Sequence, residues 1–247
     1  MVADTTDNRE MRLIANLTHQ AINPLNGVIG TLDNVIKGIV PDNKKEQRIN
    51  SARSQLEYTV SLLRNLAYFA QYSGEDIEGY RLQATHKICV IPQVIIESMQ
   101  YFQEQASNSD IAIELLNSRE QNCVKGDPDL LRQVFMNIFD NSVKYGIPSR
   151  KVIVKDWIQK KTGDLLITIE GESISFDPEE DVFALGTRGK NAKEKTSSGS
   201  GLGLYVCKTI VEKLFSGTIS AMSIGSGVGK VTFEIRLPGA FVLNKGS

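Results

Sequence analysis

Apolar residues recur at alternating spacings of three and four through the first part of the chain, and this pattern most constrains the fold. The first run is Met11, Ile14, Thr18, Ala21, Leu25, Val28, Leu32, Val35 and Ile39. The same alternation returns in Ile49, Ala52, Leu56, Thr59, Leu63, Leu66 and Ala70. Such a seam is typical of a helix packed in a coiled coil or a four-helix bundle. Because Gly38 and Pro41 mark a turn between the runs, the pattern predicts an antiparallel helical hairpin.

A single hairpin leaves part of its apolar stripe uncovered. We therefore expect a homodimer in which two hairpins form a four-helix bundle. A purely structural coiled coil explains the periodicity equally well, so any function must be argued from other residues.

Composition limits the remaining possibilities. The 247 residues leave room for two modest domains, and 41% hydrophobic and 23% charged residues are ordinary for a soluble globular protein. A net charge of -1 gives no reason to expect nucleic acid or an anionic membrane as partner. Three scattered cysteines favour a reducing compartment, and the sequence has no apolar run of ~18 residues and no signal sequence. We expect a cytoplasmic chain without membrane contact, alone or as the cytosolic part of a larger or membrane-anchored protein.

From residue 76 to residue 247 the predicted elements are shorter and mixed. Helices are expected over 92–107, 127–146 and 201–217, with Asp127 as N-cap and Pro128 in the first turn of the second. Strands are expected over 111–116, 122–126, 151–158, 164–170, 218–224 and 230–237. The fold class is then α plus α/β: a helical hairpin followed by a sandwich with one mixed sheet covered by helices on one face.

The segment SSGSGLGLYVCK places Gly199, Gly201 and Gly203 just before a helical pattern that starts near Leu202. Glycine lets the backbone approach a phosphate closely, and a helix N-terminus presents free N–H groups to an anion. Ordinary loops also contain such runs, so the motif alone does not establish a phosphate site.

Upstream, the segment NIFDNSVKYG puts Asn137, Asn141 and Lys144 on one face of a helix. Asparagine can ligate Mg²⁺ and lysine can meet a phosphate oxygen, although such a face is also common on solvated helices. Between the two motifs lies a long, basic, glycine-rich connection, which suits a segment that closes over a polyphosphate. Its cations are Arg188, Lys190, Lys193 and Lys195.

The first helix contains an unusual stretch, NLTHQAINPLNGVIG. His19 flanks the seam, and Pro24 cannot donate the helical hydrogen bond to the carbonyl of Gln20, which predicts a bend. Gly27 and Gly30 each cost ~1 kcal/mol relative to alanine in a helix. A structural bundle has no evident use for this weakening, whereas a segment that must bend around a reactive histidine does.

Taken together, these parts resemble the catalytic core of a two-component sensor histidine kinase over nearly the whole chain. THQAINPLNGVIG resembles the family's H box, NIFDNSVKY its N box, DVFALGTRGKNA its F box and early lid, and GSGLGLYV its second glycine box. The resemblance implies that residues 1–75 form a dimerisation and histidine phosphotransfer hairpin. It implies that residues 76–247 form an ATP-binding domain of the Bergerat type. ATP would phosphorylate His19, and an aspartate of a response-regulator receiver domain would then take the phosphoryl group.

The same resemblance assigns roles to individual residues. His19 is the phosphoacceptor, Gln20 stands where the family has its general base, and Asn23 stands where the family positions water for dephosphorylation of the partner. Asn141 is the expected Mg²⁺ ligand. The nucleotide site as a whole would be formed by Asn137, Asn141, Lys144, Tyr145, Arg188, Gly199, Gly201, Leu202 and Gly203.

Gln20 is the first departure from the family pattern, which has an acidic residue there. A glutamine side chain can accept a hydrogen bond but cannot act as a base near neutral pH. Loss of one general base costs ~10²–10⁴ in rate. We therefore expect a slow or conditional kinase that keeps phosphatase competence through Asn23.

The second departure is at the first glycine box, where the family has an aspartate that accepts the adenine amino group. Gly171 occupies the aspartate position, with Ser173 and Ser175 at glycine positions. Glu170 or Glu172 would replace the aspartate only after a one-residue slip. An unpaired buried donor costs ~1–3 kcal/mol, so we expect weak or base-unselective nucleotide binding. The alternative function is a degenerate kinase that acts as a histidine phosphotransferase or a docking scaffold for receiver domains.

Two other classes of protein share parts of this pattern. ATP-driven clamps related to MutL or gyrase use a glutamate one helical turn before the Mg²⁺-binding asparagine, and here Asn137 stands in that place. A coiled-coil adaptor without catalysis would not need the N box and the glycine box. Both alternatives therefore fit the sequence less well than a histidine kinase.

Overall fold

The computed structural model describes residues 3–72, 79, 86–116, 120–187, 189 and 200–243. The chain divides into two compact units, Met1–Gln71 and Tyr72–Ser247, and each is described by itself.

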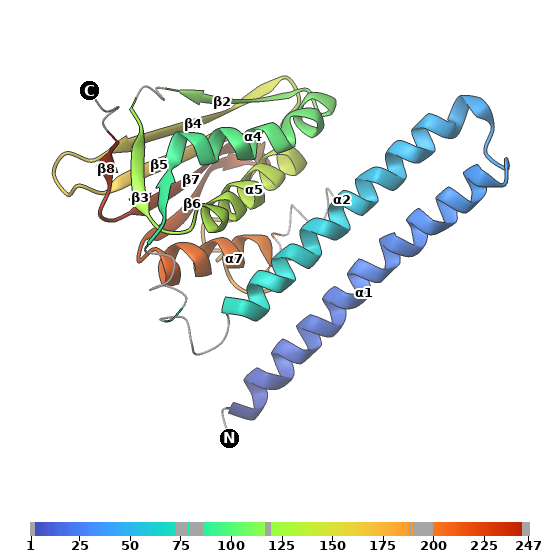
Figure 1. Cartoon of the computed structure of the whole chain (residues 1–247), viewed down its shortest axis with the longest axis horizontal. Helices are drawn as coiled ribbons and strands as arrows, with labels where there is room; N and C mark the ends of the chain where they lie inside the picture. The colour runs from blue at the N-terminus through green and yellow to red at the C-terminus, as the bar shows by residue number, and fades with distance from the viewer. Residues whose placement is uncertain are drawn as a thin grey trace. The chain divides into compact units, whose positions relative to one another are not determined.

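The first unit is the predicted antiparallel hairpin (Figure 1). Helix α1 spans Ala3–Ile36 and helix α2 spans Asp42–Tyr72. The turn between them contains Gly38, whose φ of 69° favours glycine. Helix α1 continues without interruption through Pro24, and the bend at this residue stays a prediction.

The buried strip of the hairpin is narrower than the predicted seam. On α1 it contains Leu17, Ala21 and Val28, whereas Thr18 is exposed. On α2 it contains Ala52, Thr59, Leu62, Asn65 and Phe69, so beyond Thr59 the buried positions precede the predicted ones by one residue. The contact between only two helices covers one strip of each, which leaves many apolar residues exposed. These include two rows at seven-residue spacing, Ile22, Ile29 and Ile36 on α1, and Ile49, Leu56 and Leu63 on α2.

Gly27 and Gly30 differ in their surroundings. A Cβ at Gly27 would lie 2.8 Å from Oε1 of Gln55 on α2, the end of a flexible side chain that can move aside, whereas a Cβ at Gly30 would meet nothing within 4 Å. Neither position requires glycine for packing, so the expectation that a purely structural bundle has no evident use for these glycines stays a prediction.

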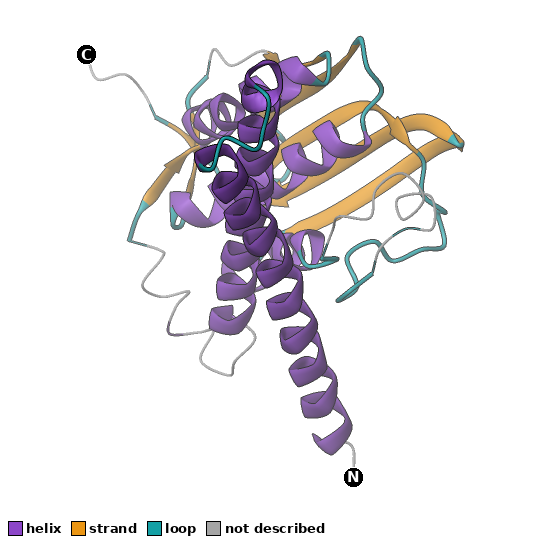
Figure 2. Cartoon of the chain, turned by 90° about the vertical axis from the view of Figure 1, so that its right-hand side faces the viewer, coloured by secondary structure: helices purple, strands orange, loops and turns teal. Residues whose placement is uncertain are grey.

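The second unit is built on a five-stranded mixed sheet with strand order β2-β4-β5-β7-β6. The β2–β4 pair is parallel, and the other neighbours are antiparallel. Figure 2 shows these strands running side by side. Their bounds are β2 Ile111–Leu116, β4 Arg150–Ile158, β5 Leu165–Ile174, β6 Thr218–Ser226 and β7 Val228–Leu237.

A second, three-stranded antiparallel sheet accompanies the first, with strand order β1-β3-β8. Its strands are β1 Ile88–Val90, β3 Asn122–Lys125 and β8 Phe241–Val242. The expectation of a single sheet is therefore wrong. Strands of three and two residues are too short to show a period of two, and so β1 and β8 gave no signal.

Three helices cover one face of the five-stranded sheet (Figure 1). They are α4 Ile91–Asn108, α5 Pro128–Tyr145 and α7 Gly203–Thr209, which continues as the π-helical turn η1 Ile210–Leu214. The sheet face toward them is apolar, and the predicted alternation in β7 is confirmed because Val231, Phe233, Ile235 and Leu237 are all buried. This layered α/β unit, preceded by the hairpin, confirms the predicted fold class.

Candidate nucleotide site and phosphoacceptor helix

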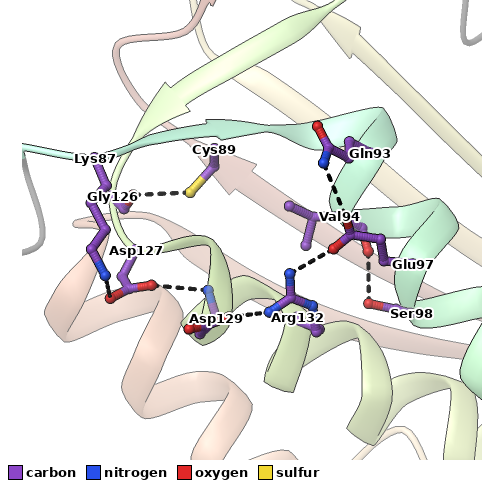
Figure 3. A network of polar contacts seen from close by, with 10 residues as sticks. All are labelled: Lys87, Cys89, Gln93, Val94, Glu97, Ser98, Gly126, Asp127, Asp129 and Arg132. Carbon is purple, nitrogen blue, oxygen red and sulfur yellow. Dashed lines mark hydrogen bonds and ion pairs between the residues drawn. The ribbon is translucent and has the colours of Figure 1, made fainter.

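Helix α5, which carries the N box, is held firmly at its N-terminus. As predicted, Asp127 caps it, since its Oδ1 accepts a hydrogen bond of 3.0 Å from the Asp129 N–H. The other oxygen of Asp127 lies 2.6 Å from Nζ of Lys87, just before β1 (Figure 3). This hydrogen bond and the charge of Asp127 raise the pKa of the Lys87 ammonium group.

A second group of contacts fixes α5 against α4 (Figure 3). Arg132 donates to Oε2 of Glu97 at 2.6 Å and also pairs with Asp129. Gln93 donates to the other oxygen of Glu97 at 2.9 Å. The hydrogen bond from Arg132 is the main reason that the pKa of Glu97 is lowered. The sequence gives no sign of this network, because contacts across 35 residues leave no local pattern.

The buried part of α5 turns Asn137 toward the protein. Its side chain is 4% exposed; Nδ2 donates to the Gly203 carbonyl at 3.1 Å, and Oδ1 accepts from Gln133 at 3.2 Å. Asn137, Asn141 and Lys144 lie on one face of helix α5, as predicted, and their contact with a nucleotide stays a prediction. Asn137 joins the N-box helix to the first residue of α7.

The last turn of α5 is half-buried and carries the other predicted N-box residues, Asn141, Lys144 and Tyr145. Lys144 lies 2.5 Å from Oδ2 of Asp140, one helical turn earlier. A phosphate contact by Lys144 would therefore compete with this ion pair. The side chain of Asn141 has no hydrogen-bond partner among the described residues, so its amide oxygen is available for a ligand.

The second glycine box is shaped by a close contact between two backbone segments. Gly201 has φ of 69°, and a Cβ there would lie 2.7 Å from the Gly186 carbonyl carbon and 2.9 Å from the Thr187 oxygen. The Gly186 N–H donates to the Gly201 carbonyl at 3.2 Å. Leu202 is fully buried beside this contact and precedes α7. The two ends of the connection between F box and glycine box are thus joined.

Several predicted phosphate contacts lie outside the described residues. They are Arg188 and Gly199, together with Lys190, Lys193 and Lys195.

At the first glycine box the structure has a strand in place of the expected loop. Strand β5 runs on to Ile174, with Gly171 paired to Val231 and Ser173 to Gly229. A Cβ at Gly171 would lie 3.2 Å from Cγ2 of buried Val152, which puts this position on the inner face of the sheet.

The neighbouring glutamates cannot replace the missing aspartate. Strand geometry directs the side chains on either side of Gly171 to the opposite face. There Glu170 pairs with Lys230 at 2.8 Å, and Glu172 pairs with Arg150 at 3.3 Å. The slip that would bring either carboxylate to the adenine is therefore contradicted.

In the hairpin, the predicted reactive residues face solvent. His19, Gln20 and Asn23 are exposed, whereas Leu17 and Ala21 on either side of His19 are buried. The seam thus passes through Leu17 and leaves Thr18 outside it. Among the described residues, no cluster of three or more His, Cys, Asp or Glu side chains could hold a metal ion.

Known proteins match these features. The family described as "Histidine kinase-, DNA gyrase B-, and HSP90-like ATPase" matches residues 126–240. The sensor protein KdpD of Clostridium acetobutylicum is 26% identical over 90% of this chain and 24% of its own length. The sensor protein SrrB of Staphylococcus aureus is 26% identical over 94% of this chain and 38% of its own length. The chain thus spans well under half of these relatives.

Solved structures share the fold. The histidine kinase AdeS of Acinetobacter baumannii has a TM-score of 0.61 and 22% identity, with coverage of 89% of this chain and 97% of that one. The histidine kinase ThkA, in complex with the response regulator protein TrrA, has a TM-score of 0.58 and 19% identity, with coverage of 92% and 61%. In this chain, no described helix is long and apolar enough to cross a membrane.

The α/β unit therefore has the fold of the histidine kinase and gyrase class of ATPases. With the hairpin before it, the chain is similar over most of its length to the corresponding parts of histidine kinases, and this similarity confirms the resemblance found in the sequence motifs.

The contact at Gly201 leads to a stability prediction. Gly201→Ala should lower the free energy of unfolding of the second unit by about 2 kcal/mol or more, because an alanine there combines a strained φ with backbone overlap. Denaturant unfolding followed by the fluorescence of the single tryptophan measures this change. Gly203→Ala is the control: its Cβ would make only ordinary contacts of 3.5 Å with Asn137, so a change below ~0.5 kcal/mol is expected. Equal losses in the two variants would contradict the packing argument.

Proposed function

We propose that the chain is the core of a sensor histidine kinase that phosphorylates His19 from ATP and passes the phosphoryl group to an aspartate of a receiver domain. The observation that carries this proposal is the hydrogen bond from the Asn137 side chain to the Gly203 carbonyl. It joins the N box and the glycine box into one side of the candidate nucleotide site. The other unit presents an exposed histidine on a long helix, as a phosphoacceptor requires.

In the proposed reaction a neutral ring nitrogen of His19 attacks the γ-phosphorus of ATP, and the bond to the β-phosphate oxygen breaks to release ADP. The imidazole loses its proton to solvent or to a neighbouring base. Gln20 cannot take this proton, so water must, and the step is slower than with a carboxylate neighbour.

Mg²⁺ fits the site through Asn141, whose amide oxygen is a hard ligand of the kind that this ion prefers. When bound, the ion would neutralise charge on the triphosphate. The N–H groups at the start of α7 and the ammonium group of Lys144 would supply further positive charge to the same phosphates.

The exposed apolar rows on the hairpin support a homodimer. Ile22, Ile29 and Ile36 on α1 would be covered by a second hairpin, as would the matching row on α2. Ile36 is 81% exposed and Ile29 58%, which is unusual for residues at heptad spacing unless another helix packs on them.

Asn23 supports a phosphatase activity in addition. It lies four residues after His19, hence one turn further along the same exposed side of α1. Its amide can hold a water molecule against the phosphoaspartate of a bound receiver domain.

One observation favours an alternative function. Gly171 provides no carboxylate at the position where the family has its aspartate, and Glu170 and Glu172 are paired on the outer face. A chain that binds ATP weakly or not at all would act as a histidine phosphotransferase or as a docking scaffold for receiver domains.

Incubation with ATP tests the proposal directly. We expect phosphohistidine in the natural protein and none in His19→Ala, as detected by Phos-tag gels and mass spectrometry. Label that persists in His19→Ala would exclude His19 as the acceptor. A natural protein that takes phosphate only from a phosphorylated receiver domain would establish the alternative function.

The role of Gln20 has its own test. Gln20→Glu should raise the rate of autophosphorylation by ~10²–10⁴, because a carboxylate next to His19 can accept the imidazole proton. Single-turnover transfer from radiolabelled ATP measures this rate. Gln20→Ala is the control and should show no gain, and a glutamate variant no faster than the natural protein would refute the base argument.

The base-binding end of the site is tested at Gly171. Gly171→Asp should tighten ATP binding by ~1–3 kcal/mol, because its carboxylate would accept the adenine amino group. Gly171→Ala adds the Cβ that crowds Val152 but no carboxylate, and it controls for that contact. Calorimetric titration with ATP and GTP should show a gain for ATP in the aspartate variant alone. If both variants bind ATP equally, the missing aspartate does not limit affinity.

A further inference from the structure

A buried pair of polar side chains connects the two sheets of the second unit, away from the residues assigned to the nucleotide. Asn122, the first residue of β3, is 2% exposed, and Asp156 on β4 is 5% exposed. Nδ2 of Asn122 donates to Oδ2 of Asp156 at 2.7 Å. The other oxygen of each group, Oδ1 in both, is buried and has no hydrogen-bond partner within the described structure.

If Asp156 were ionised, two buried acceptor oxygens would have no hydrogen-bond donor. Both oxygens without a partner are acceptors, so neither satisfies the other. No described cation pairs with Asp156, and a buried carboxylate without a cation is strongly disfavoured. A proton on Oδ1 of Asp156 removes both defects, because the hydroxyl can donate to Oδ1 of Asn122. The acid and the amide would then form a closed pair with two reciprocal hydrogen bonds.

The surroundings favour the neutral acid. Ile167 on β5 is the strand partner of Asp156, and Val242 on β8 is the strand partner of Asn122, so both neighbours are uncharged. Glu120, just before β3, is the charged group among the described residues that acts on Asp156, and its negative charge opposes ionisation. Burial is the main cause that raises the pKa of Asp156; the hydrogen bond from Asn122 lowers it, and the charge of Glu120 raises it by a smaller amount.

We propose that Asp156 is held as a neutral acid and shares its proton with Asn122, so that the pair is a proton-dependent clasp between the two sheets. Its position gives the clasp a structural consequence. Strand β3 leads through Gly126 and Asp127 directly into α5, so the clasp fixes the strand from which the N-box helix starts. This inference does not depend on whether the chain binds ATP.

The sign of the pH dependence follows from the proton count. In the unfolded chain Asp156 has an ordinary pKa near ~3.9, so between that pH and its higher folded pKa only the folded state carries the proton. The clasp is complete below the unfolded value, and its contribution is lost as the pH rises through the folded value. The folding equilibrium constant then falls by up to tenfold per pH unit across this interval.

The test compares the natural protein with Asp156→Asn in denaturant unfolding of the full chain between pH 4 and pH 8. The amide of the variant keeps both reciprocal hydrogen bonds and does not titrate. The natural protein should therefore lose stability relative to the variant as the pH rises. Its folding equilibrium constant should fall by up to tenfold for each pH unit. Glu120→Gln, which removes the opposing charge, should move the loss to lower pH. A difference that stays constant with pH would overturn the proposal.

Infrared spectroscopy gives a second test that needs no stable variant. At a pH above the ordinary titration range of aspartate, the natural protein should show the carbonyl stretch of a protonated carboxylic acid, and this band should shift in D₂O. The absence of this band would show that Asp156 is ionised, and would overturn the proposal even if Asp156→Asn fails to fold. Where the variant folds, the band should be missing from its spectrum.

Discussion

The hydrogen bond from Asn137 to the Gly203 carbonyl is the contact on which the candidate nucleotide site depends. It connects segments that are 66 residues apart and sets the start of α7 against the middle of α5. Cys207 adds a second link, since its buried thiol donates to the Val134 carbonyl at 3.6 Å. Burial raises the pKa of this thiol to about 12, so it remains protonated and uncharged there. Both contacts require that α5 keeps its position in the second unit. Asp127 and Arg132, in the N-terminal half of this helix, fix that position.

The two ends of the candidate site depend on different kinds of atoms: backbone atoms at the phosphate end and a side chain at the base end. The phosphate end is built from backbone geometry at Gly201 and Gly203, which tolerates many neighbouring side chains. The base end depends on one side chain projecting from β5, and at Gly171 there is none. A nucleotide bound here would gain most of its affinity from the triphosphate, so recognition of the base would contribute little.

The sequence predicted elements well where many residues repeat one signal. The hairpin, α4, α5 and the alternating strand β7 follow from periodicity and capping, because burial of one face imposes a regular pattern. The sequence did not predict contacts that depend on residues far apart in the chain or on a very short strand. The inward turn of Asn137, the ion pairs of Arg132 and the sheet of β1, β3 and β8 all depend on tertiary packing. For Gly171 the sequence located the departure, but only the pairing of β5 showed where the adjacent glutamates point.

The losses at Gln20 and Gly171 act on different steps, and this separates the two candidate functions. The absence of a carboxylate at Gly171 would weaken nucleotide binding, whereas the absence of a base at Gln20 would slow the proposed transfer to His19 from the bound nucleotide. A phosphotransferase needs neither group, because a phosphorylated receiver domain delivers its phosphoryl group to His19 without ATP. That reaction would require an exposed histidine, and His19 on α1 is exposed. The proposed kinase activity would additionally require the site assembled around Asn137.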